Sequence, residues 1–379
     1  MKLVITGGGS GGHTIPAITI YDALNDFYNN KDEKFDCIYI GSYDGIEKEI
    51  AKKKYISFYP IATGKLRRYF SFSNFIDIFR IFKGIFDSIK ILKKFNPQIT
   101  FSTGGFVSVP VVIASKLLKI PIVIHEQTVN VGLANKIASK FAQTVAISFL
   151  SSQKYFPKSK TIHTGQPIRK ILFNGSKENC YERFNLNKNL PIVYVTGGSQ
   201  GSHKINQILI KIIPTLINKA NIIHQCGKTQ GHNDFDELIE FKSSLNIDIQ
   251  TQYIVKDFIH EDELKDILAG SSLLIGRAGA GTVNEAIALK IPSIFIPLPF
   301  ATKNEQYENA KIMQSIGGAE IIDESNLNSE LLNKTIDLLL FNTDKHNKMK
   351  NNLNTYSNIN ATDIILDIII SKAKKLNFE

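Results

Sequence analysis

The side chains of this chain best suited to proton transfer are His13, His125 and Glu126, which follow strand-like apolar runs at residues 2–6 and 120–124. An imidazole or a carboxylate held beside a reacting group can act as a general base near neutral pH. His125 and Glu126 also fit a second interpretation, a buried hydrogen-bonded pair that braces a loop. We favour that interpretation for His125 and keep Glu126 as a catalytic candidate.

Glycine-rich turns follow four of the strand-like runs. They lie at residues 7–12, 104–105, 197–201 and 276–281, and each precedes a predicted helix. Glycines leave backbone N–H groups uncovered, and a helix N-terminus adds positive partial charge. The turns therefore predict sites for anions, above all phosphate. After the first and fourth turns we expect helices at about residues 17–28 and 286–289.

Polar side chains beside the later turns suggest what the anion belongs to. The hydroxyl of Ser199 suits a phosphate at a helix N-terminus. Glu285, in the first turn of the last of these helices, can accept hydrogen bonds from two neighbouring ribose hydroxyls, and Gln306 can reach sugar hydroxyls. The second half of the chain therefore predicts a site for a nucleotide with a diphosphate.

Strands and helices that alternate along the chain must position these groups, which predicts an α/β fold with parallel sheets. With 379 residues the chain exceeds what one core usually supports. Residues 190–201 repeat the strand and glycine turn of residues 2–12, and the rhythm breaks near residues 163–169. We therefore expect two Rossmann-like domains that face a cleft. We also expect residues 249–254 to form a strand.

Other motifs carry less weight. Residues 7–12 match the GxGxxG pattern, but the second strand ends in Gly41 and Ser42 where a dinucleotide site has an acidic residue, so a nicotinamide-dependent oxidoreductase is a weak alternative. A non-enzymatic nucleotide-sugar binder is another. Asp234 and Asp236 imitate a metal-binding pair, yet they begin a helical run, and we expect no metal there. The three cysteines lack metal-site spacing and are expected to be reduced.

The net charge of +10 suggests an anionic partner, although a Lys-rich composition explains it equally well. Residues 65–94 combine basic and aromatic side chains at helical spacing, which is typical of a helix in a membrane interface. The other interpretation is a core helix with its Phe side chains inward, and we favour it for the helix as a whole while expecting the end from Arg67 to Phe75 to be exposed. No nucleic-acid motif, signal peptide or membrane span is recognisable.

Seven motifs, in order and at matching spacing, extend over nearly the whole chain: GGGSGGHTIP, STGGFVSVP, PIVIHEQ, TGQPIR, VTGGSQG, GRAGAGTVNE and NEQYENA. By these motifs the sequence resembles the MurG family, bacterial glycosyltransferases that move N-acetylglucosamine from UDP-N-acetylglucosamine to lipid I in peptidoglycan synthesis. The resemblance implies a glycosyltransferase B fold. Residues 1–163 would be an acceptor and membrane-associating domain, residues 164–345 a donor domain, and about 346–379 a helical return to the first domain.

The resemblance also implies partners and contacts. The partners would be UDP-N-acetylglucosamine, lipid I and an anionic membrane surface, with no nucleic acid, cofactor or metal, at the cytoplasmic face of the inner membrane. Through cell-wall synthesis the enzyme would serve cell shape and division. The expected contacts of the donor are Ser10, Gly11, Gly12, Arg169, Ser199, Ile259 through its backbone to uracil, Ala280, Gly281, Thr282, Val283, Asn284, Glu285 and Gln306.

Two positions depart from the pattern of the family. Thr128 stands where asparagine is usual after His-Glu-Gln, so a sugar contact there is weaker or passes to Asn130. Ala278 replaces a more usual serine in the last glycine turn, which removes one hydroxyl. The implied mechanism is a metal-independent single displacement with inversion. His13 is the preferred base, Glu126 is the rival, and Arg169 with helix-end amides stabilises the departing UDP.

Overall fold

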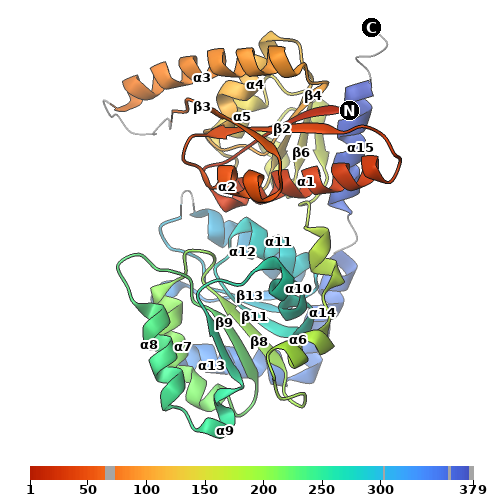
Figure 1. Ribbon diagram of the computed structural model, residues 1–379. Helices are drawn as coiled ribbons and strands as arrows, with labels where there is room; N and C mark the ends of the chain where they lie inside the picture. The colour runs from red at the N-terminus through yellow and green to blue at the C-terminus, as the bar shows by residue number, and fades with distance from the viewer. Residues whose placement is uncertain (65–72, 302–303, 357–359, 375–379) are drawn as a thin grey trace. The chain divides into compact units, whose positions relative to one another are not determined.

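The computed structural model describes residues 1–64, 73–301, 304–356 and 360–374 (Figure 1). The chain divides into two compact units, Met1–Ile168 with Ile359–Glu379, and Arg169–Asn358. We call them unit 1 and unit 2. The first division falls a few residues after the expected 163, and the return to unit 1 begins later than the expected 346, because the helix Thr343–Tyr356 packs against helices of unit 2.

Unit 1 contains a parallel sheet in the order β3-β2-β1-β4-β5-β6-β7. Its strands are β1 (Lys2–Thr6), β2 (Asp36–Ser42), β3 (Ser57–Ile61), β4 (Ile99–Ser102), β5 (Ile122–Glu126), β6 (Thr144–Ile147) and β7 (Thr161–His163). The central strands are apolar along their whole length because helices cover both faces of a parallel sheet. Neighbours along β1 show this, since Leu3 and Ile5 enter one core and Val4 enters another.

The helices of unit 1 lie on the two faces of this sheet (Figure 1). They are α1 (Gly11–Asn29), α2 (Ile46–Lys53), α3 (Ser73–Phe95), α4 (Ser108–Leu117), α5 (Leu133–Ala138) and α15 (Ala361–Lys374). Helices α1 and α15 share one core cluster with β1, whereas α3 and α4 share the opposite one. Helix α15, whose Ile365 and Ile369 are fully buried, thus completes the core of unit 1 from the far end of the chain.

Unit 2 repeats this plan with the strand order β10-β9-β8-β11-β12-β13, again all parallel. Its strands are β8 (Ile192–Thr196), β9 (Asn221–Gln225), β10 (Tyr253–Lys256), β11 (Ser271–Gly276), β12 (Ser293–Phe295) and β13 (Ala319–Ile321). Its helices are α6 (Lys177–Arg183), α7 (His203–Leu216), α8 (Asp234–Ser244), α9 (Ile247–Gln250), α10 (Glu261–Gly270), α11 (Ala280–Ala288), α12 (Glu305–Ile316), α13 (Ser329–Ile336) and α14 (Thr343–Tyr356). The strand expected at residues 249–254 is partly wrong, because α9 takes its first residues and β10 begins at Tyr253.

In both sheets the strand order reverses direction beside the first strand of the unit. This switch point lies between β1 and β4 in unit 1 and between β8 and β11 in unit 2. Helices that follow the two strands at such a point leave for opposite faces, so a crevice opens at the carboxyl ends of the strands. All four glycine-rich turns follow these strands: two in each unit.

Helix α3 differs from the expectation that its Phe side chains point inward. Phe79, Phe82 and Phe86 are 74%, 57% and 65% exposed, whereas Leu92 and partly buried Ile residues face the core. The inward interpretation is wrong for these three. Residues 65–72, with most of the Arg67–Phe75 end, lie outside the described residues. Within the described ranges no helix is both long and apolar enough to cross a bilayer.

Candidate active site

The first glycine loop ends directly at a helix N-terminus. Helix α1 begins at Gly11 and not near Ala17, with Ser10 in extended conformation as its N-cap residue. The carbonyl of Ser10 accepts hydrogen bonds from the N–H groups of His13 and Thr14, at 3.2 Å each. The N–H groups of Gly11 and Gly12 belong to the first helical turn, whose donors have no partner within the helix. The loop can therefore offer backbone donors to an anion.

The buried carboxylate of Glu47, which the sequence analysis missed, forms hydrogen bonds that support this loop. Glu47, the second residue of α2, is fully buried and accepts hydrogen bonds from the N–H and hydroxyl of Ser42, at 3.0 and 2.6 Å. It also accepts one from the N–H of Gly9, at 3.3 Å. A Cβ atom at Gly8 or Gly45 would lie within 2.5 or 2.1 Å of its carboxylate group. Glu47 thus ties the loop to the end of β2.

His13 is held in the tautomer that suits a base. Its Nδ1 lies 2.9 Å from the carbonyl oxygen of Thr103 and 3.2 Å from Oε1 of Gln127. Both partners are acceptors, so Nδ1 must carry the proton. The lone pair of the neutral ring then lies on Nε2, which has no hydrogen-bond partner among the described residues. The hydroxyl of Thr103 in turn donates to the carbonyl oxygen of His13 at 2.7 Å.

Glu126 is occupied by local contacts. Its side chain is buried, and Oε1 accepts hydrogen bonds from the N–H and hydroxyl of Thr128, at 3.0 and 2.9 Å. Oε2 accepts one from the side-chain amide of Asn135 at 3.1 Å. Thr128, the departure from the family pattern, is therefore a partner of Glu126. This arrangement braces the loop after β5 and leaves the carboxylate less available as a base than His13.

His125 braces the same region as a neutral ring. It is fully buried, and its Nε2 lies 3.1 Å from the carbonyl oxygen of Gly165, to which it donates. Burial lowers the pKa of His125 to about 4, because the charged ring would lose its hydration. The structural interpretation of His125 agrees with these contacts.

In unit 2, the turn after β8 leaves Ser199 exposed beside the N-terminus of α7. Gln225, which the sequence analysis missed, connects this turn to the other side of the site. Its Nε2 donates to the carbonyl oxygen of Gly198 at 3.1 Å, and its Oε1 accepts from the N–H of Ile259 at 3.1 Å. The carbonyl oxygen of Ile259 is then the backbone group that a ligand can use.

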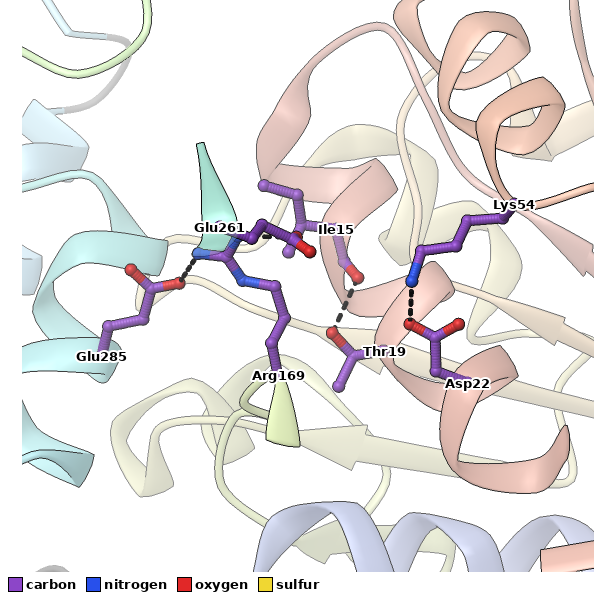
Figure 2. Close-up of polar contacts among 7 residues, drawn as sticks. All are labelled: Ile15, Thr19, Asp22, Lys54, Arg169, Glu261 and Glu285. Atoms are coloured by element: carbon purple, nitrogen blue, oxygen red, sulfur yellow. Dashed lines mark hydrogen bonds and ion pairs between the residues drawn. The ribbon is translucent and has the colours of Figure 1, made fainter. Parts of the chain in front are cut away.

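Arg169 lies between two carboxylates of unit 2 (Figure 2). Its Nη2 is 2.7 Å from Oε1 of Glu285, and its Nη1 is 2.9 Å from Oε1 of Glu261. Burial alone would lower the pKa of Arg169, but the two carboxylates outweigh burial and raise it above its ordinary value. Among the described residues, its buried Nε atom has no hydrogen-bond partner. Arg169 is thus a permanent cation with a spare donor.

Helix α11 begins at Ala280 and not at Ala286, so most of the expected contacts lie on its first two turns. Gly281 is exposed, Val283 is fully buried, and Asn284 is turned back, since its side-chain amide donates to the carbonyl oxygen of Ala280 at 2.8 Å. Thr282 is partly exposed. Ala278, the second departure from the family pattern, is also fully buried.

Two further side chains fix the surroundings of this turn. Arg277 donates to the carbonyl oxygens of Ile296 and Pro297, at 3.0 and 3.2 Å, and so anchors the turn to the end of β12. Gln306 on α12 accepts a hydrogen bond from the N–H of Leu298 at 3.0 Å through Oε1. Its Nε2 is then the group that can meet a ligand.

The candidate residues thus form one group in each unit. Unit 1 holds Ser10, Gly11, Gly12, His13 and Glu126 at its switch point. Unit 2 holds the rest, namely Arg169, Ser199, Ile259, Ala280 to Glu285 and Gln306. The first group combines backbone donors with a base, whereas the second combines helix N-termini, a cation and a carboxylate. The second group fits the stabilisation of a negatively charged leaving group.

The sequence matches the glycosyltransferase family 28 N-terminal domain over residues 3–147 and the glycosyltransferase family 28 C-terminal domain over residues 192–363. The chain belongs to glycosyltransferase family 28. Both members of the family's domain pair are therefore present, each on one parallel sheet. Family membership excludes the nicotinamide-dependent oxidoreductase and the non-enzymatic binder that the glycine patterns left open.

Among curated members of the family, proteins of Clostridium botulinum and Clostridium perfringens are similar to this chain. They are 40% and 42% identical, over 99% and 98% of both chains. Both are named UDP-N-acetylglucosamine--N-acetylmuramyl-(pentapeptide) pyrophosphoryl-undecaprenol N-acetylglucosamine transferase. This chain is thus an N-acetylglucosamine transferase of family 28.

Solved structures show the same fold. Acinetobacter baumannii MurG is 26% identical with a TM-score of 0.73, over 98% of this chain and 99% of that one. A UDP-GlcNAc 2-epimerase from Neisseria meningitidis, bound to UDP-GlcNAc, has a TM-score of 0.69 at 13% identity, over 98% of this chain and 100% of that one. The second likeness concerns the fold alone. The expected glycosyltransferase B fold is confirmed.

Replacing Glu47 by Gln should destabilise unit 1, because the amide cannot accept all the hydrogen bonds that the carboxylate accepts. We expect a loss of about 1–3 kcal/mol in the free energy of unfolding. Guanidinium unfolding monitored by circular dichroism measures it. The matched control is Glu49→Gln, an exposed residue of the same helix, which should change little. Equal stability of the two variants would contradict the role of Glu47.

Acid should destabilise unit 1 through His125. Its pKa is about 4 in the folded chain and 6.5 when unperturbed, so the unfolded chain binds the extra proton between these values. The stability that the neutral ring contributes is present above pH 6.5 and is lost as the pH falls towards 4, by about 1.4 kcal/mol per pH unit.

The variant His125→Gln isolates this effect, because glutamine does not titrate. Urea unfolding between pH 4.5 and 7 should show a smaller loss of stability on acidification in the variant than in the wild type. His260→Gln, a change at an exposed histidine, is the control and should keep the wild-type slope. A variant with the wild-type slope would contradict this role, because it would mean that His125 binds its proton equally well in the folded and the unfolded chain.

Proposed function

We propose that this enzyme transfers N-acetylglucosamine from UDP-N-acetylglucosamine to the 4-hydroxyl of the muramyl sugar of lipid I, with inversion, and so makes lipid II for peptidoglycan. The observation that carries the proposal is the similarity to curated transferases of this name over essentially the whole chain. The two groups of site residues support it, because one suits the donor and the other suits the acceptor.

Unit 2 is the donor domain in this proposal. The N-termini of α7 and α11 supply backbone donors for the diphosphate, and the hydroxyl of Ser199 adds another. The backbone of Ile259 meets the uracil, and Glu285 meets the ribose hydroxyls. Gln306 uses its Nε2 for a sugar hydroxyl. These assignments follow the family resemblance, and the geometry of each residue is compatible with them.

The pair between Arg169 and Glu285 must change when the donor binds. If Arg169 is to meet the diphosphate while Glu285 meets ribose, their 2.7 Å contact is exchanged for contacts with the ligand. Glu261, 2.9 Å from the other guanidinium nitrogen, remains as a partner of Arg169. The buried Nε of Arg169 gains an acceptor at the same time, so the donor satisfies an atom that has no partner among the described residues.

Unit 1 is the acceptor domain. The loop of Ser10, Gly11 and Gly12 provides helix-end donors that suit the diphosphate of a lipid-linked sugar and the anionic part of the donor. His13 takes the proton of the attacking 4-hydroxyl on Nε2 as the bond to the anomeric carbon forms and the bond to UDP breaks. The imidazole is then a cation hydrogen-bonded to Thr103 and Gln127, two acceptors that stabilise it. No metal enters this reaction.

The replacement His13→Ala should reduce turnover by on the order of a hundredfold or more and leave donor affinity little changed, because the base acts only in the transition state. The assay measures UDP release that depends on a lipid I analogue. Glu126→Gln is the parallel variant, with thermal unfolding as a check on its fold. A nearly normal rate in His13→Ala would assign the base to Glu126. UDP release that is independent of the acceptor would contradict the proposed transfer.

We also propose that unit 1 binds the cytoplasmic face of the inner membrane as a peripheral protein, through helix α3. Phe79, Phe82 and Phe86 recur at a spacing that places them along one exposed face of the helix. Exposed basic residues accompany them: Arg80, Lys83, Lys90, Lys93 and Lys94. Aromatic side chains can enter the headgroup region while the basic ones meet anionic lipids.

Replacing Phe79, Phe82 and Phe86 together by Ser should weaken binding to vesicles that contain phosphatidylglycerol by about tenfold or more, since most of the inserted apolar area is lost. Sedimentation with vesicles measures the bound fraction. The control is Phe300→Ser, an exposed Phe of unit 2 that should leave binding unchanged. If the triple variant binds as well as the wild type, α3 is not the attachment surface.

A further inference from the structure

A cluster of metal-binding side chains lies in unit 2 outside the groups assigned to transfer. His203, His232 and Asp234 each offer one ligand atom, and these atoms all lie within 4.8 Å of one another. Nδ1 of His203 is 2.6 Å from Oδ1 of Asp234. The rings of His203 and His232 stack with their centroids 3.7 Å apart. Two imidazoles and one carboxylate are ligands that zinc and similar ions bind in proteins.

Two segments of unit 2 bring these ligands together. His203 is the first residue of α7, Asp234 is the first residue of α8, and His232 lies in the loop just before α8. Asp234 is almost fully buried, whereas His232 is exposed and His203 is 39% exposed. The carboxylate is therefore fixed, and the two rings can adjust and leave one side open to water.

Buried hydrogen bonds hold the carboxylate in a fixed orientation. Asn206, which is fully buried, donates from Nδ2 to Oδ2 of Asp234 at 2.8 Å. Its Oδ1 lies 3.0 Å from Nε2 of His224. Oδ2 of Asp234 is thus held by Asn206, and Oδ1 contacts His203. Metal sites in proteins commonly orient their ligands by such outer contacts.

We propose that His203, His232 and Asp234 bind a divalent transition-metal ion such as Zn²⁺, with water in the remaining position. Metal bonds of about 2.0–2.2 Å would place neighbouring ligand atoms roughly 3.3 Å apart. The hydrogen-bonded pair of His203 and Asp234 then opens by less than about 1 Å, with the metal in place of the shared proton.

The site is different from the pair that the sequence imitates. Asp236 is exposed on the first turn of α8 and is not a member of the cluster. Asp234 instead joins a histidine 31 residues earlier in the chain. The proposal therefore revises the expectation that no metal binds at Asp234, because a ligand set without Asp236 surrounds this carboxylate.

A metal here would fasten the loop before α8 to the start of α7. The two segments already meet closely, since a Cβ atom at Gly201 would lie 2.1 Å from the carbonyl oxygen of Cys226 and 2.8 Å from the hydroxyl of Thr229. The glycine turn at residues 197–201 lies between β8 and α7, so the ion would stiffen a turn that we assign to the donor. The ion itself has no part in the displacement, and its binding does not depend on the proposed function.

The test is direct metal binding by the untagged, full-length protein after removal of metals with a chelator. We expect one equivalent of Co²⁺ to bind and to give the visible absorption of a low-symmetry site, and Zn²⁺ to displace it. Isothermal titration measures the Zn²⁺ affinity, and thermal unfolding should show a metal-dependent rise in Tm. His232→Ala should weaken binding at least about tenfold and abolish the rise in Tm.

Two further variants complete the experiment. His203→Ala should weaken binding similarly, and because both histidines are partly or fully exposed, neither variant should lose its fold in the absence of metal. His260→Ala, a change at an exposed histidine outside the cluster, is the control and should bind like the wild type. Absence of stoichiometric binding to the wild type, or equal binding to His232→Ala, would overturn the proposal.

Discussion

The direction of the strands is the constraint on which the rest of this structure depends. Because every strand pair in both sheets is parallel, the carboxyl ends of β1 and β4, and of β8 and β11, lie at one edge of their sheet. Each of these strands is followed by a helix that begins at that edge, and the glycine-rich turns make these connections in very few residues. The backbone donors of α1 and α11 are aimed at the edge as a consequence of topology. The candidate binding groups therefore lie at positions that the parallel topology determines.

The fold and the glycine-rich turns of the site could be predicted from the sequence because their signals are local. Apolar runs such as residues 2–6 and 190–196 are typical of strands that are buried on both faces of a parallel sheet, and glycines after them mark the turns. The ends of helices were less predictable. Helices α1 and α11 begin six residues earlier than expected, because Gly11 and Gly281 favour a loop in sequence-based prediction. The first turn of a helix nevertheless tolerates glycine. The outward direction of Phe79, Phe82 and Phe86 could not be read from spacing, since either face of α3 is rich in apolar residues.

The groups behind the site could not be predicted, because their partners are distant in sequence. Glu47 lies in a short run of charged residues that predicts a solvent-exposed helix. Its carboxylate is nevertheless buried, where it accepts hydrogen bonds from the N–H groups of Gly9 and Ser42. Gln225 ends the buried strand β9, and nothing in the sequence indicates that it connects Gly198 with Ile259. The role of such a polar side chain can be recognised only in the three-dimensional structure, which shows which buried N–H and C=O groups need a hydrogen-bond partner. These residues decide whether a flexible glycine turn keeps one shape.

The return of α15 to the first sheet has a consequence for how the chain folds during synthesis. Unit 2 is continuous in sequence, whereas the core of unit 1 includes Ile365 and Ile369, which are synthesised after unit 2. The face of β1 and α1 that these residues cover therefore has no partner while unit 2 is made, and the core of unit 1 can be completed only after the residues of unit 2 have been synthesised. Closing this contact joins residues more than three hundred positions apart, which makes it a late and entropically costly step. Until it closes, the nascent chain presents an apolar surface of the kind that chaperones bind.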